Sequence, residues 1–139
     1  MSLRALALVS GVYDLLPGIG MLTAAPELAR LFGAPAPVPI VNAWLNGVFT
    51  LTLAGGYFWA AGDVVARRGY LWWAGVFAKS LGAAVFIADH YLNDSPASYL
   101  LFAASDGTLA LWTLALLLLG REAYGGAEGQ TVGRSAAPR

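Results

Sequence analysis

The chain has 139 residues, of which 58% are hydrophobic and only 12% are charged, and its formal net charge is zero. Soluble domains carry about 25% charged residues, so this composition favours lipid over water as the surrounding solvent. The even charge balance leaves no basic surface for nucleic acid. The absence of cysteine excludes disulfides and thiolate metal sites, and a single histidine excludes a His-rich metal site within one chain.

Four segments are long and apolar enough to cross a bilayer core, which takes about 20 mostly apolar residues in a helix. The predicted spans are residues 5–24, 40–61, 70–92 and 97–120. The short connections between them predict an all-α fold, an antiparallel four-helix transmembrane bundle in one domain of residues 1–120. Residues 121–139 are rich in Gly and Ala, which predicts a flexible cytoplasmic tail.

The connection between the first two spans has its own pattern. Residues 34–39 read APAPVP, which cannot continue a helix because proline lacks a donor and restricts the residue before it. The preceding residues 25–33 predict a short interfacial helix, with Pro26 at its start and Gly33 at its end.

The arginines predict the orientation of the four spans. Both termini and the connection 62–69 lie on one side of the membrane, and the connections 25–39 and 93–96 lie on the other. The first side carries Arg4, Arg67, Arg68, Arg121, Arg134 and Arg139, and the second carries only Arg30. The positive-inside rule therefore predicts a multi-pass protein of the inner (plasma) membrane with both termini in the cytoplasm.

Three ionisable residues fall near the middle of the membrane. Asp14, Lys79 and Asp106 each lie about nine residues from the start of a span, at about 1.5 Å of rise per residue. An isolated charge at that depth is costly, so such residues face the bundle interior and pair. We expect Lys79 to hold Asp14, with Asp106 as a second partner. On the third span, Lys79 shares a face with Ala83, Phe86 and His90.

This buried polar cluster has two interpretations. It is either a clasp between helices that fixes their packing and register, or a proton-responsive or ligand-binding site at the midplane. The sequence favours neither interpretation over the other.

A second polar group marks the outer ends of two spans. Asp89 and His90 lie where the third span ends, and Asn42 and Asn46 lie one turn apart near the outer end of the second. They predict an outer vestibule, or in the simpler interpretation an interfacial cap. His90 is also a candidate axial ligand for haem or a chlorophyll-type pigment, which would need a partner chain or a five-coordinate metal. No catalytic motif, phosphate loop or metal-ligand spacing accompanies them.

In its hydropathy pattern and the positions of its buried charges, the chain resembles a known group of proteins. The features are GVYDLLPGIGML in the first span, Lys79 in the third and SDGTLALWTLALLLL in the fourth. With them the chain is similar to small four-helix bacterial membrane proteins of the broad DoxX-like kind. The resemblance implies a four-span fold, and some members of that group are accessory subunits of quinone-linked membrane oxidoreductases. It implies no catalytic residue.

Three functions stay open. The leading hypothesis is a non-catalytic accessory subunit or binding module that holds a small apolar ligand, such as a quinone or lipid, as a homo-oligomer or within a larger membrane complex. The second is an oligomeric proton-coupled transporter in which Asp14 and Asp106 carry protons. The third is a membrane enzyme acting on a lipid-soluble substrate, with Asp89 and His90 as acid and base. The first leads because one protomer of this length has little room for a permeation path.

Overall fold

The protein is described by a computed structural model that covers the backbone of residues 1–134 and the side chains of residues 1–119. Between its turns the described chain is helical throughout, which confirms the all-α prediction. Its elements are α1 (Leu3–Thr23), α2 (Ala25–Leu31), α3 (Val41–Gly62), α4 (Arg68–Tyr70), a π-helix (Leu71–Ala78), α5 (Lys79–Asn93), a 3₁₀ turn (Ala97–Tyr99) and α6 (Leu100–Arg134).

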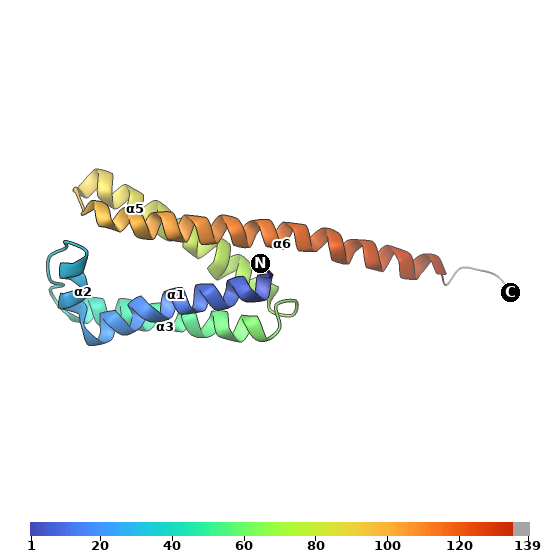
Figure 1. The fold of residues 1–139 in the computed structure, drawn as a ribbon, viewed down its shortest axis with the longest axis horizontal. Coiled ribbons are helices and arrows are strands. Elements are labelled where there is room, and N and C mark those ends of the chain that lie inside the picture. The colour runs from blue at the N-terminus through green and yellow to red at the C-terminus, as the bar shows by residue number, and fades with distance from the viewer. Residues whose placement is uncertain (135–139) are drawn as a thin grey trace.

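The long helices lie along one axis, and successive long helices run in opposite directions (Figure 1). α1 packs along α3, and α5 packs along α6. The N-terminus and the turn at residues 63–67 lie at one end, called here the N-terminal end. α2 and the turn at residues 94–99 lie at the other, called here the α2 end (Figure 1).

The helix bounds are close to those predicted for the first three spans. α1 and α3 match the first two, and α4, the π-helix and α5 form one continuous helix, Arg68–Asn93, that matches the third. α6 starts after the 3₁₀ turn and continues to Arg134. The predicted flexible tail lies outside the residues whose side chains are described, and it stays a prediction.

Within the described residues, three helices are long and apolar enough to cross a membrane: Leu3–Thr23, Arg68–Asn93 and Ala97–Leu119. These helices indicate a chain with several candidate membrane spans. α3 has 22 residues, enough for a crossing, but it is less apolar because it includes Asn42 and Asn46. Length and composition alone therefore leave the fourth predicted crossing open.

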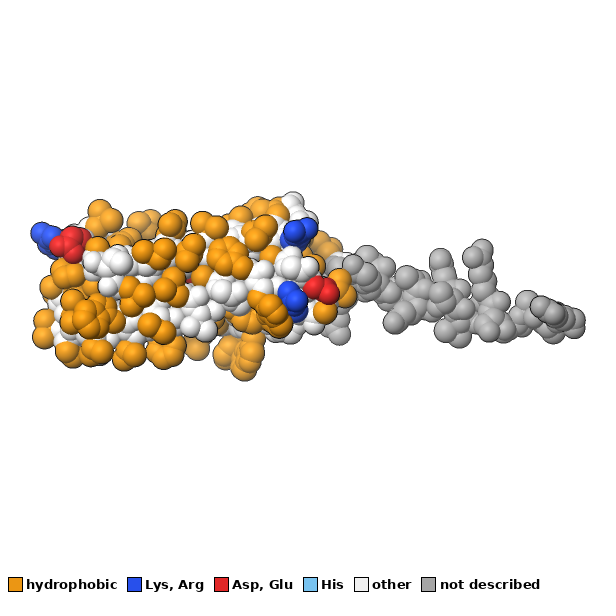
Figure 2. Space-filling model, turned by 90° about the horizontal axis from the view of Figure 1, so that it is seen from below, with side chains coloured by type: hydrophobic (Ala, Val, Ile, Leu, Met, Phe, Trp, Pro, Cys, Tyr) orange, Lys and Arg blue, Asp and Glu red, His pale blue; other side chains and the backbone are white. Residues whose placement is uncertain are grey.

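The lateral surface is apolar, and its charges lie at the ends. Figure 2 shows hydrophobic side chains over the body of this face and charged side chains grouped at its two extremities. Large side chains in the helix middles are open to the surroundings, among them Leu16 at 65%, Phe49 at 66%, Trp73 at 67% and Leu111 at 69%. A soluble monomer rarely exposes so continuous an apolar surface, whereas acyl chains cover it without cost.

The interfacial helix predicted at residues 25–33 is present as α2 (Ala25–Leu31), with proline in its first turn. Gly33 follows at φ 68°, in the left-handed region that glycine adopts without a steric penalty. The proline-rich segment that comes next is not helical, as predicted. The chain thus turns back at the α2 end and delivers α3 alongside α1.

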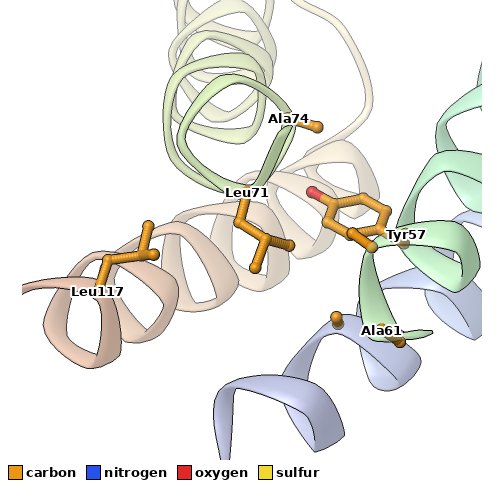
Figure 3. Packing of buried hydrophobic residues seen from close by; sticks show 7 residues of the cluster. Tyr57, Ala61, Leu71, Ala74 and Leu117 are labelled. Atoms are coloured by element: carbon orange, nitrogen blue, oxygen red, sulfur yellow. The ribbon is translucent and has the colours of Figure 1, made fainter. Parts of the chain in front are cut away.

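Small residues close the N-terminal end of the bundle. Seven buried residues form what we call the packed cluster: Ala7, Tyr57, Ala60, Ala61, Leu71, Ala74 and Leu117. Figure 3 shows Leu71 between Leu117 and Tyr57, the three coming from different helices, with Ala61 on the helix of Tyr57. Because four of the seven are alanine, the helix backbones approach closely, as membrane helices do where no hydrophobic force drives them together. Arg68 adds a hydrogen bond to the carbonyl oxygen of Leu117.

Candidate functional site

Lys79 lies between two aspartates from two other helices. Its Nζ donates to Asp14 Oδ1 at 2.9 Å and to Asp106 Oδ1 at 3.1 Å. The side chains of Lys79 and Asp14 are each 7% exposed and that of Asp106 is 14% exposed. The predicted cluster is therefore present, and it joins α1, α5 and α6 in one layer. We call it the charged layer.

The π-helix ends at the residue before Lys79. A π-helix places more residues in each turn than an α-helix does, so it changes the direction in which the following side chains point. Beyond it, Lys79 and Ala83 are buried, and Phe86 and His90 are half-buried. The face predicted for the third span is therefore present.

Glycine lets α5 and α6 come close beside the charged layer. A Cβ built at Gly82 would lie 3.2 Å from Asp106 Oδ2, and one built at Gly75 would lie 2.8 Å from Thr113 Cγ2. The second distance is shorter than real Cβ atoms allow. Gly75 in the π-helix and Gly82 in α5 therefore allow the close approach to α6 over which Lys79 reaches Asp106.

Two tyrosines surround the ammonium group, and sequence reasoning missed both. Lys79 Nζ lies 4.5 Å from the ring centre of Tyr13 and 5.7 Å from that of Tyr57. Both distances are within the range of a cation–π interaction. The Tyr13 hydroxyl is 2.7 Å from Ser105 Oγ. One signal was available: Tyr13 and Ser105 directly precede Asp14 and Asp106 in the sequence.

The charged layer is not fully satisfied by its own hydrogen bonds. Among the described side chains, three buried polar atoms have no partner: Ser10 Oγ, Asp14 Oδ2 and the Tyr57 hydroxyl. Leaving a buried polar group unpaired costs about 1–3 kcal/mol. In a native structure such atoms call for a physical explanation.

A cavity of about 590 Å³ lies between the helices and reaches the charged layer. All three charged residues line it, and so does Tyr57. Its other walls are mostly apolar or aromatic, and include Phe32, Phe86 and Phe102. Cavities of about 300–1,000 Å³ with apolar walls and a few polar groups are typical binding sites for small molecules.

Aromatic side chains close the cavity at the α2 end. The ring centres of Phe32 and Phe102 are 4.7 Å apart, and those of Phe86 and Phe102 are 5.4 Å apart. Ser98 donates a hydrogen bond to the carbonyl oxygen of Phe32. The segment after α2 is therefore tied to the start of α6, across the space between the two helix pairs.

The rim of the cavity lies along α3. Asn42, Asn46 and Leu53 line the cavity and are also exposed, so they stand at its edge. Opposite them, the cavity wall formed by the helix of Lys79 includes Ala78 and Gly82, which are half-buried. Both helices lie within the apolar body of the protein, so this rim opens onto its lateral apolar surface (Figure 2).

The structure places the four residues of the predicted outer vestibule in two separate groups. Asn42 and Asn46 line the cavity, whereas Asp89 and His90 hydrogen-bond to the turn that follows them. Asp89 accepts from Asn93 Nδ2 at 2.8 Å and from Ser95 Oγ, and His90 Nδ1 is 2.7 Å from the carbonyl oxygen of Ser95. Asp89 and His90 thus bond to their own turn and do not line the cavity, and both interpretations of them stay predictions.

Metal binding has no geometric support in the described part of the chain, where no three His, Asp or Glu side chains are grouped to hold an ion. The hypothesis that His90 is an axial ligand stays a prediction.

Comparison with known proteins returned no relative. No family model matches the chain, and no curated protein or solved structure is similar to it at a significant level. The resemblance to DoxX-like membrane proteins therefore gains no support beyond the residues that suggested it, and the site must be interpreted from its own geometry.

Proposed function

We propose that this chain is a four-span membrane protein that binds a small lipid-soluble molecule in the cavity above its charged layer. It acts as a non-catalytic binding module or accessory subunit. The observation that carries the proposal is a cavity of about 590 Å³ with mostly apolar walls and the Asp14–Lys79–Asp106 layer in its lining.

The composition of α3 supports a fourth crossing. Its polar residues Asn42, Asn46, Thr50 and Tyr57 all line the cavity. They are separated by four, four and seven positions, which puts them on one side of the helix. Apart from Thr52, which is exposed, these polar side chains of α3 are thus explained by a site, and the rest of its surface is suited to lipid.

The arginines support cytoplasmic termini. Arg4, Arg67 and Arg68 belong to the N-terminal end, and Arg30 belongs to the α2 end, where it pairs with Glu27 at 3.0 Å. Arg67 also lies 4.5 Å from the ring centre of Trp59, an arrangement suited to the membrane interface.

Native mass spectrometry of the protein in mild detergent tests the binding function. We expect a small lipid-soluble molecule to remain bound to the wild type and to be lost from Ala78→Phe, which places a ring in the cavity. Ala84→Phe is the matched control, because Ala84 lies on the same helix, is exposed and does not line the cavity. A wild type that carries no such molecule, or an Ala78→Phe variant that keeps it, would contradict the proposal.

One observation favours the transporter as second candidate: charged residues line the cavity at mid-membrane depth. A proton-coupled transporter predicts substrate-dependent proton flux in proteoliposomes that is lost in Asp14→Asn while folding is kept. For the enzyme hypothesis, Asp89 and His90 bond to their own turn and do not line the cavity, so nothing in the geometry favours them as acid and base.

A further inference from the structure

The cavity is covered at the α2 end and open along its side. At the α2 end it is lined by α2 and by the contact of Phe32 with Phe102. Figure 1 shows that the pair α1–α3 and the pair α5–α6 lie farther apart toward this end. Along the side, the rim residues Asn42, Asn46 and Leu53 line the cavity and are exposed. The open route to the cavity is therefore lateral, between α3 and the helix of Lys79.

This open side has the length of one leaflet of a bilayer. Asn42 is the second residue of α3 (Val41–Gly62), and Leu53 lies eleven residues further along. At about 1.5 Å per residue, the rim between them is about 16 Å long. Half of the hydrocarbon core of a bilayer is about 15 Å thick. A lipid acyl chain of the leaflet at the α2 end therefore covers the same depth as the rim.

The floor of the cavity offers little polar surface to a ligand. The side chains of Asp14 and Lys79 are each 7% exposed and that of Asp106 is 14% exposed, and the ammonium group already donates to both carboxylates. The rings of Tyr13 and Tyr57 lie 4.5 Å and 5.7 Å from that ammonium group. The oxygen atoms without partners, Asp14 Oδ2 and the Tyr57 hydroxyl, are buried. The floor therefore suits the apolar end of a ligand.

Polar groups that a ligand can reach lie at the other end of the rim. The amides of Asn42 and Asn46 are exposed, line the cavity and lie one turn apart. An amide both donates and accepts hydrogen bonds. The 22 residues of α3 span about 33 Å, and the hydrocarbon core is about 30 Å thick. Asn42 therefore lies at the edge of the core, next to the lipid heads, and Asn46 lies one turn below it.

From this geometry we propose that the cavity takes up an acyl chain of a membrane lipid from the leaflet at the α2 end. The chain enters sideways between α3 and the helix of Lys79. The polar head of the lipid stays at Asn42 and Asn46, and the end of the chain lies against the charged layer. This proposal rests on the binding function proposed above, and it adds the ligand class, its source and its orientation.

Photolabelling in phosphatidylcholine nanodiscs tests the proposal on the full chain. Two phosphatidylcholine probes carry a diazirine on one acyl chain, the first probe close to the head and the second close to the terminal methyl group. The crosslinked residues are mapped in the wild type, in Ala78→Phe and in Ala84→Phe. Only Ala78 lines the cavity, whereas Ala84 is exposed on the same helix. Label that is lost in Ala78→Phe and kept in Ala84→Phe therefore comes from the cavity.

We expect the two probes to label opposite ends of the cavity. The first probe should give the higher yield around Asn42 and Asn46, and the second should give the higher yield around Asp14 and Lys79. Because each residue is compared between two probes, its own reactivity toward the diazirine cancels. Asp14 and Lys79 are buried, so lipid on the lateral surface does not reach them. The order of the probes in the wild type therefore decides even if Ala78→Phe does not fold.

Two variants of α3 test the polar end of the site. Asn46→Leu removes the deeper amide from an exposed position, so it should fold. It should raise the mole fraction of probe needed for half-maximal cavity label about fivefold, the value of one hydrogen bond. Thr52→Val is the matched control, because Thr52 is exposed on the same helix and does not line the cavity. It should leave that mole fraction unchanged.

The outcomes separate the two proposals. If the probes label the cavity in the reverse order or at both ends alike, the lipid orientation is wrong while the binding function stands. If Asn46→Leu behaves like Thr52→Val, the assigned polar end is wrong. If neither probe labels the cavity but native mass spectrometry finds another molecule that Ala78→Phe displaces, the acyl chain is wrong and the binding function stands. If Ala78→Phe displaces no molecule of either kind, the binding function itself fails.

Discussion

The two ends of this bundle are built differently. At the N-terminal end, the packed cluster fills the space between helices with alanine, leucine and one tyrosine ring, and its members are almost fully buried. Toward the α2 end, the same helices leave a cavity of about 590 Å³, which is lined on that side by α2 and by an aromatic contact with the segment after it. The charged layer and Tyr57 lie where the two regions meet. Packing fixes the helices at one end and leaves room for a ligand at the other.

The largest expected effect comes from the charged layer at that junction. Lys79→Leu would leave two carboxylates facing each other in a dry interior, and removing one partner of a buried ion pair costs about 3–5 kcal/mol. Equilibrium unfolding by SDS titration in detergent micelles measures the free energy of unfolding. The triple variant with leucine at positions 14, 79 and 106 should recover most of this loss, because no unpaired charge remains.

Two controls make this result specific. Arg30→Leu breaks an exposed pair with Glu27 and should change stability little. If the triple variant is as unstable as Lys79→Leu, the loss of stability does not come from unpaired buried charges, and the expectation is wrong.

The next prediction compares how much a buried leucine contributes to stability at the two ends of the bundle. Leu71→Ala removes a side chain that is 1% exposed in the packed cluster, and such truncations cost about 2–5 kcal/mol. Leu28→Ala removes the same atoms from a half-buried side chain that already borders the cavity. It should cost clearly less in the same SDS titration. Equal losses would show that the cavity region is as tightly packed as the cluster.

The long helices, the charged layer and α2 could be predicted from the sequence, because each depends on local features of the chain. Hydropathy located the long helices, and the cost of a buried charge brought Asp14, Lys79 and Asp106 together before any coordinates were known. Proline and Gly33 marked α2. Each of these inferences depends on one segment or on one depth in the membrane.

The cavity could not be predicted, because it depends on how far two helix pairs separate. The π-helix before Lys79 has no clear signature in LWWAGVFA, and it packs against α6. Asn42 and Asn46 were correctly noticed as a polar pair. They were grouped with Asp89 and His90 because all four lie toward one end, and sequence gives depth along a helix more reliably than direction around it.

A smaller effect is expected where the helices approach most closely. A Cβ at Gly75 would clash with Thr113 Cγ2, which is on a buried residue of α6, so Gly75→Ala should cost about 1–3 kcal/mol through overpacking. At Gly107, in the same pair of helices, the nearest atom to a built Cβ is Ala83 Cβ at 3.9 Å. Gly107→Ala should therefore gain up to about 1 kcal/mol from helix propensity. Similar losses in both variants would contradict the proposed close contact.

The smallest effect compares two tyrosine hydroxyls beside the same lysine. The Tyr13 hydroxyl is 2.7 Å from Ser105 Oγ, and the Tyr57 hydroxyl has no partner among the described residues. Tyr13→Phe should therefore cost about 0.5–1.5 kcal/mol. Tyr57→Phe should cost nothing or raise the free energy of unfolding, since it removes an unsatisfied group and keeps the ring that faces Lys79. SDS titration of ligand-free protein measures both. Equal losses would mean that the Tyr57 hydroxyl already has a hydrogen-bond partner in the protein.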